Sequence, residues 1–113
     1  MVKFSIFLRK HPDMNQEDFV YYHKNNHAPL FTSLPEVKQF VRKYIQYHTL
    51  QVSLPELPPL PYDGITELWF DDVESIAKVF SSELYMQQIR PDEQKFLDLY
   101  NCSYLITMEN IVI

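Results

Sequence analysis

Alternating apolar and polar residues open the chain, which predicts a strand over residues 2–9. A helical spacing follows, and Asn15 is well placed to cap a helix that runs from residue 16 to about 26. One row of this helix, in which every fourth residue recurs, carries Phe19, His23 and His27. The chain therefore begins with a half-buried strand and a helix that has histidines on one side.

Prolines interrupt the pattern next. Pro29 disfavours helical backbone at the residue before it and frees a carbonyl one turn earlier, so we expect the helix to break or kink near His27. A short second piece should run from residue 30 to 34 and end before Pro35. Residues 37–50 then alternate as a strand does, and one face of it carries Phe40, Arg42, Tyr44, Gln46 and His48.

The second half begins with a proline-rich loop over residues 51–62, which is too stiff and irregular for a helix or strand. In the turn that follows, Gly64 is expected to supply a left-handed backbone conformation. A strand over residues 65–70 comes next, and Asp71 should cap a helix that Pro91 stops. The pattern thus predicts a further strand and helix.

A short helix from Asp92 and a last strand over residues 102–113 complete the order strand, helix, strand, strand, helix, strand. This order is typical of an α+β, ferredoxin-like fold: a β-α-β-β-α-β subunit with a four-stranded antiparallel sheet and helices on one face. The other face needs a cover, and its candidate residues are Phe7, Tyr44 and Trp69 or Phe70. We expect a homodimer in which two sheets close into a dimeric α+β barrel.

Composition narrows the classes of function. The 113 residues suit a single domain over residues 1–113. A formal charge of −5 argues against nucleic acid or an anionic membrane as partner, because phosphate groups would be repelled. Gly64 is the only glycine, which excludes the glycine-rich loops that bind nucleotides. We therefore expect no cofactor.

The compartment is also indicated by composition. Cys102 is the only cysteine, so an intrachain disulfide is impossible and a reducing compartment is favoured. Apolar runs fall short of the roughly 20 residues that span a membrane. The charged N-terminal residues are unlike a signal peptide. These features predict a soluble, cytoplasmic protein.

Histidines are the first candidates for chemistry. His27 lies at the expected helix break, where its imidazole could face a cavity, bond a freed backbone carbonyl and act as general acid or base. It could instead be a histidine near a helix C-terminus that only satisfies carbonyls. His48 shares a strand face with Gln46 and Tyr44, and three polar tips suit either a wet cavity or an exposed strand face.

The sequence gives less support to metal binding and to stacking on a substrate. His23 and His27 have the spacing of a metal-binding pair, but the glutamate of the H-E-x-x-H motif is absent. A third ligand could come only from elsewhere in the fold, so we expect no metal site. Taken alone, Trp69 favours packing in the core or at an interface over stacking on a substrate.

Four blocks of the sequence resemble the EthD family. Residues 19–30 (F-V-Y-Y-H-K-N-N-H-A-P-L) are similar to its F-x-x-Y-W-x-x-x-H-A-P-L segment, and residues 42–48 (R-K-Y-I-Q-Y-H) to its R-Y-x-Q-x-H strand. Residues 62–71 (Y-D-G-I-T-E-L-W-F-D) are similar to its Y-D-G-x-x-E-L-W-F-D block, and residues 92–97 to its D-E-x-x-F segment. The resemblance covers nearly the whole chain in order, but His23 stands where the family usually has tryptophan.

The resemblance implies a dimeric α+β barrel, a superfamily that includes polyketide cyclases and dehydratases, quinol monooxygenases and haem-handling enzymes. The founding group of the family is tied to a monooxygenase system for ether degradation, and fungal relatives are dehydratases on aromatic polyketides. The resemblance also strengthens the expectation that the catalytic residues are His27, His48 and Tyr44. The candidate substrate-binding residues are Tyr22, His23, Gln46 and Trp69.

Three functions remain open, each with a small hydrophobic molecule as partner. The first is cofactor-free acid–base chemistry (dehydration, cyclisation or enolisation) on an aromatic or ketide-like compound, in which His27 moves a proton and His48 with Tyr44 polarises a carbonyl. The second is an oxidoreductase or monooxygenase-type or accessory protein, which would have to be cofactor-independent or work with a separate redox partner. The third is a non-catalytic ligand-binding dimer. The first hypothesis, as stated, requires His27 and His48 to face a common cavity.

Overall fold

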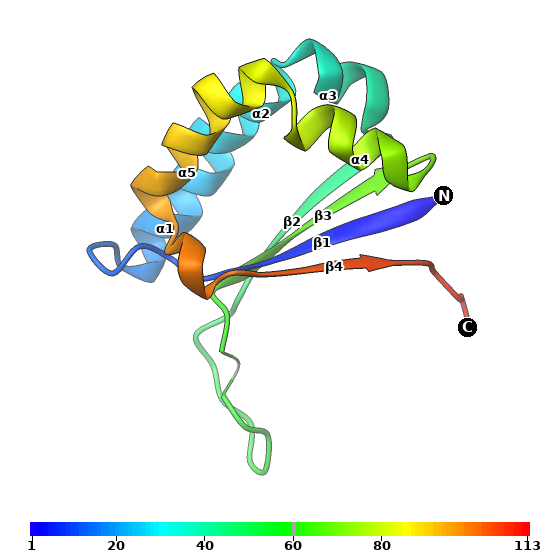
Figure 1. Ribbon diagram of the computed structural model, residues 1–113. Helices are drawn as coiled ribbons and strands as arrows, with labels where there is room; N and C mark the ends of the chain where they lie inside the picture. The colour runs from blue at the N-terminus through cyan, green and yellow to red at the C-terminus, as the bar shows by residue number, and fades with distance from the viewer. Residues whose placement is uncertain (60) are drawn as a thin grey trace.

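Four antiparallel strands form one sheet in the computed structural model, which describes residues 1–59 and 61–113 (Figure 1). The strands are β1 (Val2–Leu8), β2 (Lys43–His48), β3 (Gly64–Phe70) and β4 (Ser103–Thr107). Their spatial order is β2-β3-β1-β4, so β1 and β3 lie in the interior and β2 and β4 at the edges. The predicted β-α-β-β-α-β order is confirmed, although β4 ends at Thr107 rather than at residue 113.

The helices lie together on one face of the sheet (Figure 1). In the first half they are α1 (Gln16–Tyr22), the π-helical turn η1 (His23–His27), α2 (Ala28–Thr32) and α3 (Pro35–Phe40). In the second half they are α4 (Val73–Phe80), the π-helical turn η2 (Tyr85–Ile89), α5 (Arg90–Phe96) and the 3₁₀ turn η3 (Leu99–Asn101). Within the described residues, these helices are all too short or too polar to cross a membrane.

Pro29 does not break the first helix, contrary to our expectation. The helix instead widens by one residue over η1, where the Ala28 N–H donates to the carbonyl of His23, five residues earlier. The backbone at His27 and Ala28 stays right-handed helical. Because the wide turn shifts the carbonyls that a proline ring would meet in a regular helix, α2 continues directly from η1.

Pro91 follows the same arrangement in the second half, where we expected it to stop a helix. The Arg90 N–H donates to the carbonyl of Tyr85 across the wide turn η2, and α5 continues from it through Pro91. Both prolines therefore occupy the second position after a π-helical turn.

Two predicted helix starts have different outcomes. Asn15 caps α1 as expected, because its side chain accepts a hydrogen bond from the Asp18 N–H at 2.8 Å. The cap of α4 is Asp72, which accepts from the Ser75 N–H at 2.9 Å, so the assignment of the cap to Asp71 is wrong by one residue. Both caps satisfy an N–H group that has no partner within its helix.

The strand predicted over residues 37–50 is wrong in its first part, because residues 35–40 are helical. Pro35 stands at the first position of α3, where its missing N–H costs no hydrogen bond, and Glu36 suits the first turn. Val37 is buried against the core. Strand pairing begins only at Lys43.

Alternation along the strands divides their residues between two faces. The face under the helices, here called the covered face, includes Ile6, Leu8, Tyr44, Gln46, His48, Thr66, Leu68 and Phe70. The opposite, open face includes Phe7, Tyr47, Glu67 and Trp69. Phe7 and Trp69 were expected on the open face and lie there, whereas the assignment of Tyr44 and Phe70 to it is wrong. Successive residues of a strand point to opposite faces, so Phe70 faces away from its neighbour Trp69. Tyr44 does the same, because it follows Lys43, the residue that pairs with Trp69.

Gly64 has no left-handed backbone, so the reason we gave for glycine here is also wrong. It is the first residue of β3 and pairs with both Leu8 and His48. A Cβ atom at this position would lie 2.7 Å from the carbonyl oxygen of Tyr47. Glycine is therefore required by the close approach of β2, not by its dihedral angles.

The proline-rich loop between β2 and β3 protrudes from one end of the sheet (Figure 1). Its described residues form no helix or strand, as predicted, and residue 60 lies outside the described part. Several of its aliphatic side chains are exposed, namely Leu50, Val52, Leu54 and Leu57. The loop therefore lies away from the core between the helices and the sheet.

Candidate functional site

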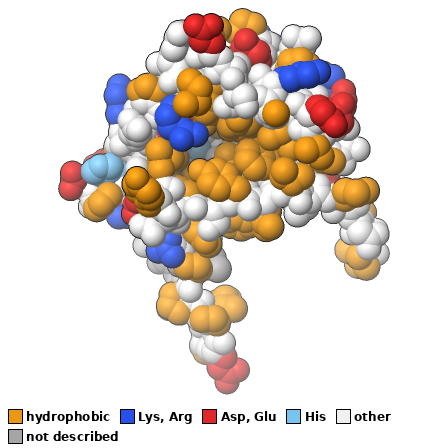
Figure 2. Space-filling model, in the orientation of Figure 1, with side chains coloured by type: hydrophobic (Ala, Val, Ile, Leu, Met, Phe, Trp, Pro, Cys, Tyr) orange, Lys and Arg blue, Asp and Glu red, His pale blue; other side chains and the backbone are white. Residues whose placement is uncertain are grey.

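A narrow cleft lies between the helices and the covered face, and its cavity volume is about 20 Å³. Apolar side chains dominate its lining, namely Ile6, Leu8, Phe31, Leu68, Phe80, Phe96, Leu97 and Leu99. The polar groups that line it are His23, His27, Tyr44, Thr66, Glu93 and Tyr104. Tyr104 is half exposed, and Figure 2 shows hydrophobic side chains gathered between α4 and β4 on this side. The cleft is therefore apolar with a few polar groups, as small-molecule sites are.

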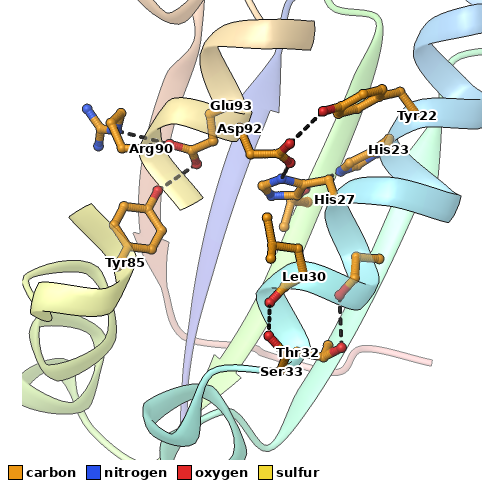
Figure 3. A network of polar contacts seen from close by, with 12 residues as sticks. Tyr22, His23, His27, Leu30, Thr32, Ser33, Tyr85, Arg90, Asp92 and Glu93 are labelled. Carbon is orange, nitrogen blue, oxygen red and sulfur yellow. Dashed lines mark hydrogen bonds and ion pairs between the residues drawn. The ribbon is translucent and has the colours of Figure 1, made fainter. Parts of the chain in front are cut away.

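His27 of η1 and Asp92 of α5 form a buried pair (Figure 3). The His27 Nδ1 atom lies 2.9 Å from Asp92 Oδ2, and each side chain is 9% exposed. An ionised carboxylate can only accept, so Nδ1 carries a proton and donates it to Asp92. The other ring nitrogen, Nε2, has no hydrogen-bond partner among the described residues, and it is free to act on a molecule in the cleft.

Tyr22 supports Asp92 from the opposite side of the carboxylate (Figure 3). Its hydroxyl donates to Asp92 Oδ1 at 2.5 Å. Burial acts to raise the pKa of Asp92, but the hydrogen bonds from His27 and Tyr22 outweigh it and hold this pKa below its usual range. Burial and the hydrogen bond to Asp92 raise the pKa of Tyr22 to about 12. Asp92 is thus a charged acceptor that fixes the orientation of His27.

Glu93 is a second carboxylate of α5, and it lines the cleft itself. The Tyr85 hydroxyl donates to its Oε2 at 2.5 Å, and Arg90 Nε donates to its Oε1 at 3.0 Å (Figure 3). Burial raises the pKa of Glu93, although these hydrogen bonds act in the opposite direction. Both carboxylate oxygens are already occupied, so Glu93 is held in place by its own partners rather than by His27.

Tyr44 presents a hydroxyl to the cleft from the sheet side. Its oxygen accepts a hydrogen bond from Gln46 Nε2 at 2.8 Å, and the same amide donates to the His23 carbonyl at 3.0 Å. Burial raises the pKa of Tyr44 to about 12, although the hydrogen bond from Gln46 opposes the shift. Tyr44 therefore keeps its proton at neutral pH and can donate it into the cleft.

His23 lies between the cleft and a third histidine. It is 1% exposed, its Nδ1 lies 3.0 Å from His48 Nε2, and its Nε2 lies 3.2 Å from Thr66 Oγ1. Burial, with smaller effects from His27 and His48, lowers the pKa of His23 to about 3. Burial and the nearby charge of Lys24 lower the pKa of His48 as well. Both rings are therefore neutral near pH 7.

The sequence-predicted site residues separate into three groups. His27, His23 and Tyr44 line the cleft. The next group lies outside the lining: Gln46 bonds Tyr44, His48 bonds His23, and Tyr22 bonds Asp92, the partner of His27. Trp69 lies on the open face, under Lys3 and Lys43, and its indole N–H donates to Glu109.

The cavity shared by His27 and His48 that the first hypothesis required is not found, because the lining includes His27 but not His48. The buried ring of His23 lies between the two. His27 also bonds a carboxylate rather than the freed backbone carbonyl that we expected. The wide turn explains the difference, because the helix was never interrupted near His27.

Sequence reasoning missed four residues that complete the site, namely Thr66, Tyr85, Asp92 and Glu93. Asp92 and Glu93 were interpreted as the start of a helix, since acidic residues favour a first turn. No local signal in the sequence distinguishes them from an ordinary helix start, because their burial is seen only in the structure. Among the described residues, no three His, Cys, Asp or Glu side chains are grouped so that they could hold a metal ion.

Comparison with known proteins agrees with this architecture. The family model described as EthD domain matches residues 11–100. "Dehydratase CTB10" of Cercospora beticola is 27% identical over 106 residues, which cover 84% of this chain and 79% of that protein. "Conidial pigment biosynthesis dehydratase EthD" of Metarhizium robertsii is 28% identical over 95 residues, which cover 77% of this chain and 67% of that protein.

Solved structures share the fold at low sequence identity. An EthD family protein of Bacillus halodurans superposes with a TM-score of 0.70 at 22% identity, over 97% of this chain and 99% of that one. A protein of Bacteroides fragilis, described as dimeric with a ferredoxin-like fold, gives a TM-score of 0.65 at 10% identity, over 96% and 95% of the two chains. These likenesses establish the ferredoxin-like subunit.

Proposed function

The chain belongs to the EthD family, and we propose that it is a dehydratase that removes water from a small, hydrophobic or aromatic β-hydroxy carbonyl compound bound in the cleft. The reaction needs a base beside an apolar wall and a donor for the carbonyl oxygen, and it needs no cofactor. The names of the two fungal relatives, both dehydratases, favour this hypothesis over an oxidoreductase.

One observation carries the proposal, namely the orientation of His27 by Asp92. A carboxylate on Nδ1 sets the tautomer in which Nε2 can accept a proton, and it stabilises the imidazolium that forms. The pair is enclosed by Phe96 and Phe31, whose rings lie 4.9 and 6.2 Å from the imidazole centre. Bulk water is thereby kept from the base, as proton abstraction next to a carbonyl requires.

In this proposal His27 Nε2 removes the proton on the carbon between the carbonyl and the hydroxyl-bearing carbon. The Tyr44 hydroxyl donates to the carbonyl oxygen, which takes up negative charge as the C–H bond breaks. The electron pair then forms the C=C bond, the C–O bond to the hydroxyl breaks, and the hydroxyl leaves as water after receiving a proton. Phe31 lies between the two acting residues, 5.5 Å from the Tyr44 ring, and forms the apolar wall.

The test uses a β-hydroxy aryl ketone, whose dehydration yields a conjugated enone that absorbs in the ultraviolet. His27→Gln should lower kcat by at least about 100-fold, and Tyr44→Phe by about 10- to 100-fold, the usual range for one acid–base group. His11→Gln makes the same change in the loop before α1 and should leave the rate unaltered. Equal ligand affinity in wild type and His27→Gln, without turnover in either, would support the non-catalytic dimer instead.

A second copy of this chain is the proposed cover of the open face. Phe7, Tyr47 and Trp69 lie on this face, and the similar protein of Bacteroides fragilis is described as dimeric. Two sheets packed face to face would bury these side chains in a self-complementary contact. Sedimentation equilibrium should therefore give twice the chain mass of 13.6 kDa, and a mass of one chain would overturn the barrel proposal.

A further inference from the structure

A row of hydrogen bonds runs from the rim of the molecule to the floor of the cleft. Its outer member is His48, a partly exposed residue at the end of β2. His48 Nε2 lies 3.0 Å from Nδ1 of the buried His23, and His23 Nε2 lies 3.2 Å from Thr66 Oγ1. Both His23 and Thr66 line the cleft. The proposed chemistry of His27 and Tyr44 uses none of these three residues.

The row can carry a proton because of the state of the middle ring. A neutral imidazole has one donor and one acceptor nitrogen, and both nitrogens of His23 are engaged. The row therefore has two complete arrangements. In one, His48 donates to His23, which donates to Thr66, so the Thr66 hydroxyl proton points into the cleft. In the other, every bond is reversed and the proton points outward from His48. A proton has crossed the row when one arrangement replaces the other.

We propose that His48, His23 and Thr66 form a proton relay whose end, Thr66, protonates the leaving hydroxyl of the substrate. The proposal rests on the dehydratase function above and names the acid that it left unassigned. The middle position suits this role, because the imidazole of His23 can both donate and accept a hydrogen bond and can therefore pass a proton on.

The proton balance closes over one turnover. The Thr66 proton moves to the substrate oxygen as the C–O bond breaks, and water forms. Thr66 is reprotonated by His23 Nε2, and His23 Nδ1 takes the Nε2 proton of His48, which gains a proton from solvent at Nδ1. His27 keeps the proton taken from carbon and releases it to solvent after the product leaves. One proton enters at His48 and one leaves from His27.

The relay also has a geometric consequence. His27 belongs to the helical side of the cleft and Thr66 to the strand β3 below it. The proton on carbon and the hydroxyl would leave toward opposite walls, so the relay predicts an anti elimination. If His27 both removed the proton and returned it to the hydroxyl, the two groups would leave toward one wall, a syn elimination.

Thr66→Val tests the relay, because valine keeps the branched shape and removes only the hydroxyl. Dehydration of a β-hydroxy aryl ketone should slow by about 100-fold. The acetate ester of the same ketone needs no proton on its leaving group, and its elimination should change by less than about threefold. Thr66→Ser should restore most of the rate. Thr107→Val is the matched control, since Thr107 lies on a strand and its hydroxyl has no partner among the described residues.

Deuterium exchange separates a failure of the relay from a failure of the proposed function. An aryl alkyl ketone without a β-hydroxyl can exchange its α-hydrogens in D₂O through His27 alone. Exchange should persist in Thr66→Val and be lost in His27→Gln. If wild-type protein exchanges no α-hydrogen, the dehydratase function falls. If exchange persists, two results would overturn the relay while leaving the dehydratase function intact. One is dehydration of the hydroxy ketone by Thr66→Val at the wild-type rate. The other is an equal loss of rate on the hydroxy ketone and on its acetate ester.

Nitrogen NMR on histidine-labelled protein needs no substrate. Thr66 does not bond His48, so Thr66→Val should alter the tautomer signals of His48 only if His23 couples the two. We expect the Nδ1 and Nε2 signals of His48 to shift toward a single tautomer in Thr66→Val and to stay unchanged in Thr107→Val. Identical His48 signals in wild type and Thr66→Val would overturn the coupling on which the relay depends. Syn elimination from a stereospecifically deuterated substrate would overturn the direction of protonation.

Discussion

The two helical segments above the cleft, η1 with α2 and η2 with α5, share one backbone arrangement and differ in what it carries. Each has a wide turn of five residues, one further residue, and then a proline. The first and fifth residues of each turn are buried: His23 and His27 in η1, Tyr85 and Ile89 in η2. The same geometry thus presents imidazoles in one segment and core-packing side chains in the other.

The difference shows how the two segments cooperate. In the η1 segment the wide turn itself carries the reactive group, His27. In the η2 segment the carboxylates come after the proline, where Asp92 reaches His27 and Glu93 is tied to Tyr85 of its own turn. One segment supplies the base, and the other supplies the charge that orients it. Three predictions test this division.

The largest expected effect concerns the free energy of unfolding in acid. As pH falls, His23 of the first segment should lower it and Glu93 of the second should raise it. His23 has a pKa of about 3 in the folded protein, below the value near 6.5 expected when unfolded. The unfolded chain therefore binds more protons as pH falls below about 6.5, and folding loses roughly 3 kcal/mol between pH 7 and pH 4 from this group. His23→Phe should remove most of that loss, measured by urea unfolding at several pH values.

Glu93 provides the opposite control in the same experiment. Its pKa is raised in the folded protein, so the folded state holds a proton more readily and Glu93 adds stability as pH falls. Glu93→Gln should therefore steepen the loss of stability in acid. An acid profile of His23→Phe that matches wild type would show that the η1 segment does not carry a buried neutral imidazole.

The next largest effect separates the two carboxylates of α5. Asp92→Asn should lower kcat by about 100-fold, equivalent to about 2.7 kcal/mol, because an amide cannot stabilise the imidazolium of His27. Glu93→Gln should cost far less, because Glu93 bonds Tyr85 and Arg90 instead. Steady-state kinetics on one substrate compares the two variants directly. Equal losses would mean that Glu93 also acts in the reaction.

The smallest effect concerns the prolines. Proline inside a regular helix costs about 3 kcal/mol, but Pro29 and Pro91 each follow a wide turn that already accommodates the ring. Replacing either by alanine should change the free energy of unfolding by less than about 1 kcal/mol, and by similar amounts at both sites. Thermal melts of the two variants test this. A large gain in stability at one site alone would show that the two turns are not equivalent.

Much of the fold could be predicted from local patterns. The period of two located β1 and β3, because both strands have one face under the helices. Asn15 could be identified as a cap because its hydrogen bond is made to the first turn of the helix that directly follows it in the sequence. The pattern failed over residues 37–42, because residues 37–40 belong to the six-residue helix α3 that Pro35 starts and strand pairing begins only at Lys43. A piece that short has no clear helical period.

The candidate site was less predictable, for physical reasons. His27 could be singled out as reactive, but its partner Asp92 is 65 residues away and no local pattern joins them. The wide turns were hidden because a proline inside a helical pattern normally marks an end. Asp92 and Glu93 also suit the first turn of a helix, so their burial could not be told from an ordinary helix start.

Each wide turn amounts to one residue inserted into a helix of ordinary pitch. One residue rotates a helix by roughly 100°, so His27 faces the cleft only because η1 contains the extra residue. A relative with the same number of residues between Phe19 and His27 but a regular helix would direct its histidine elsewhere, whereas one residue fewer without the wide turn would keep its direction. The presence of the wide turn, together with the residue count, would then decide which members of the family can share this chemistry.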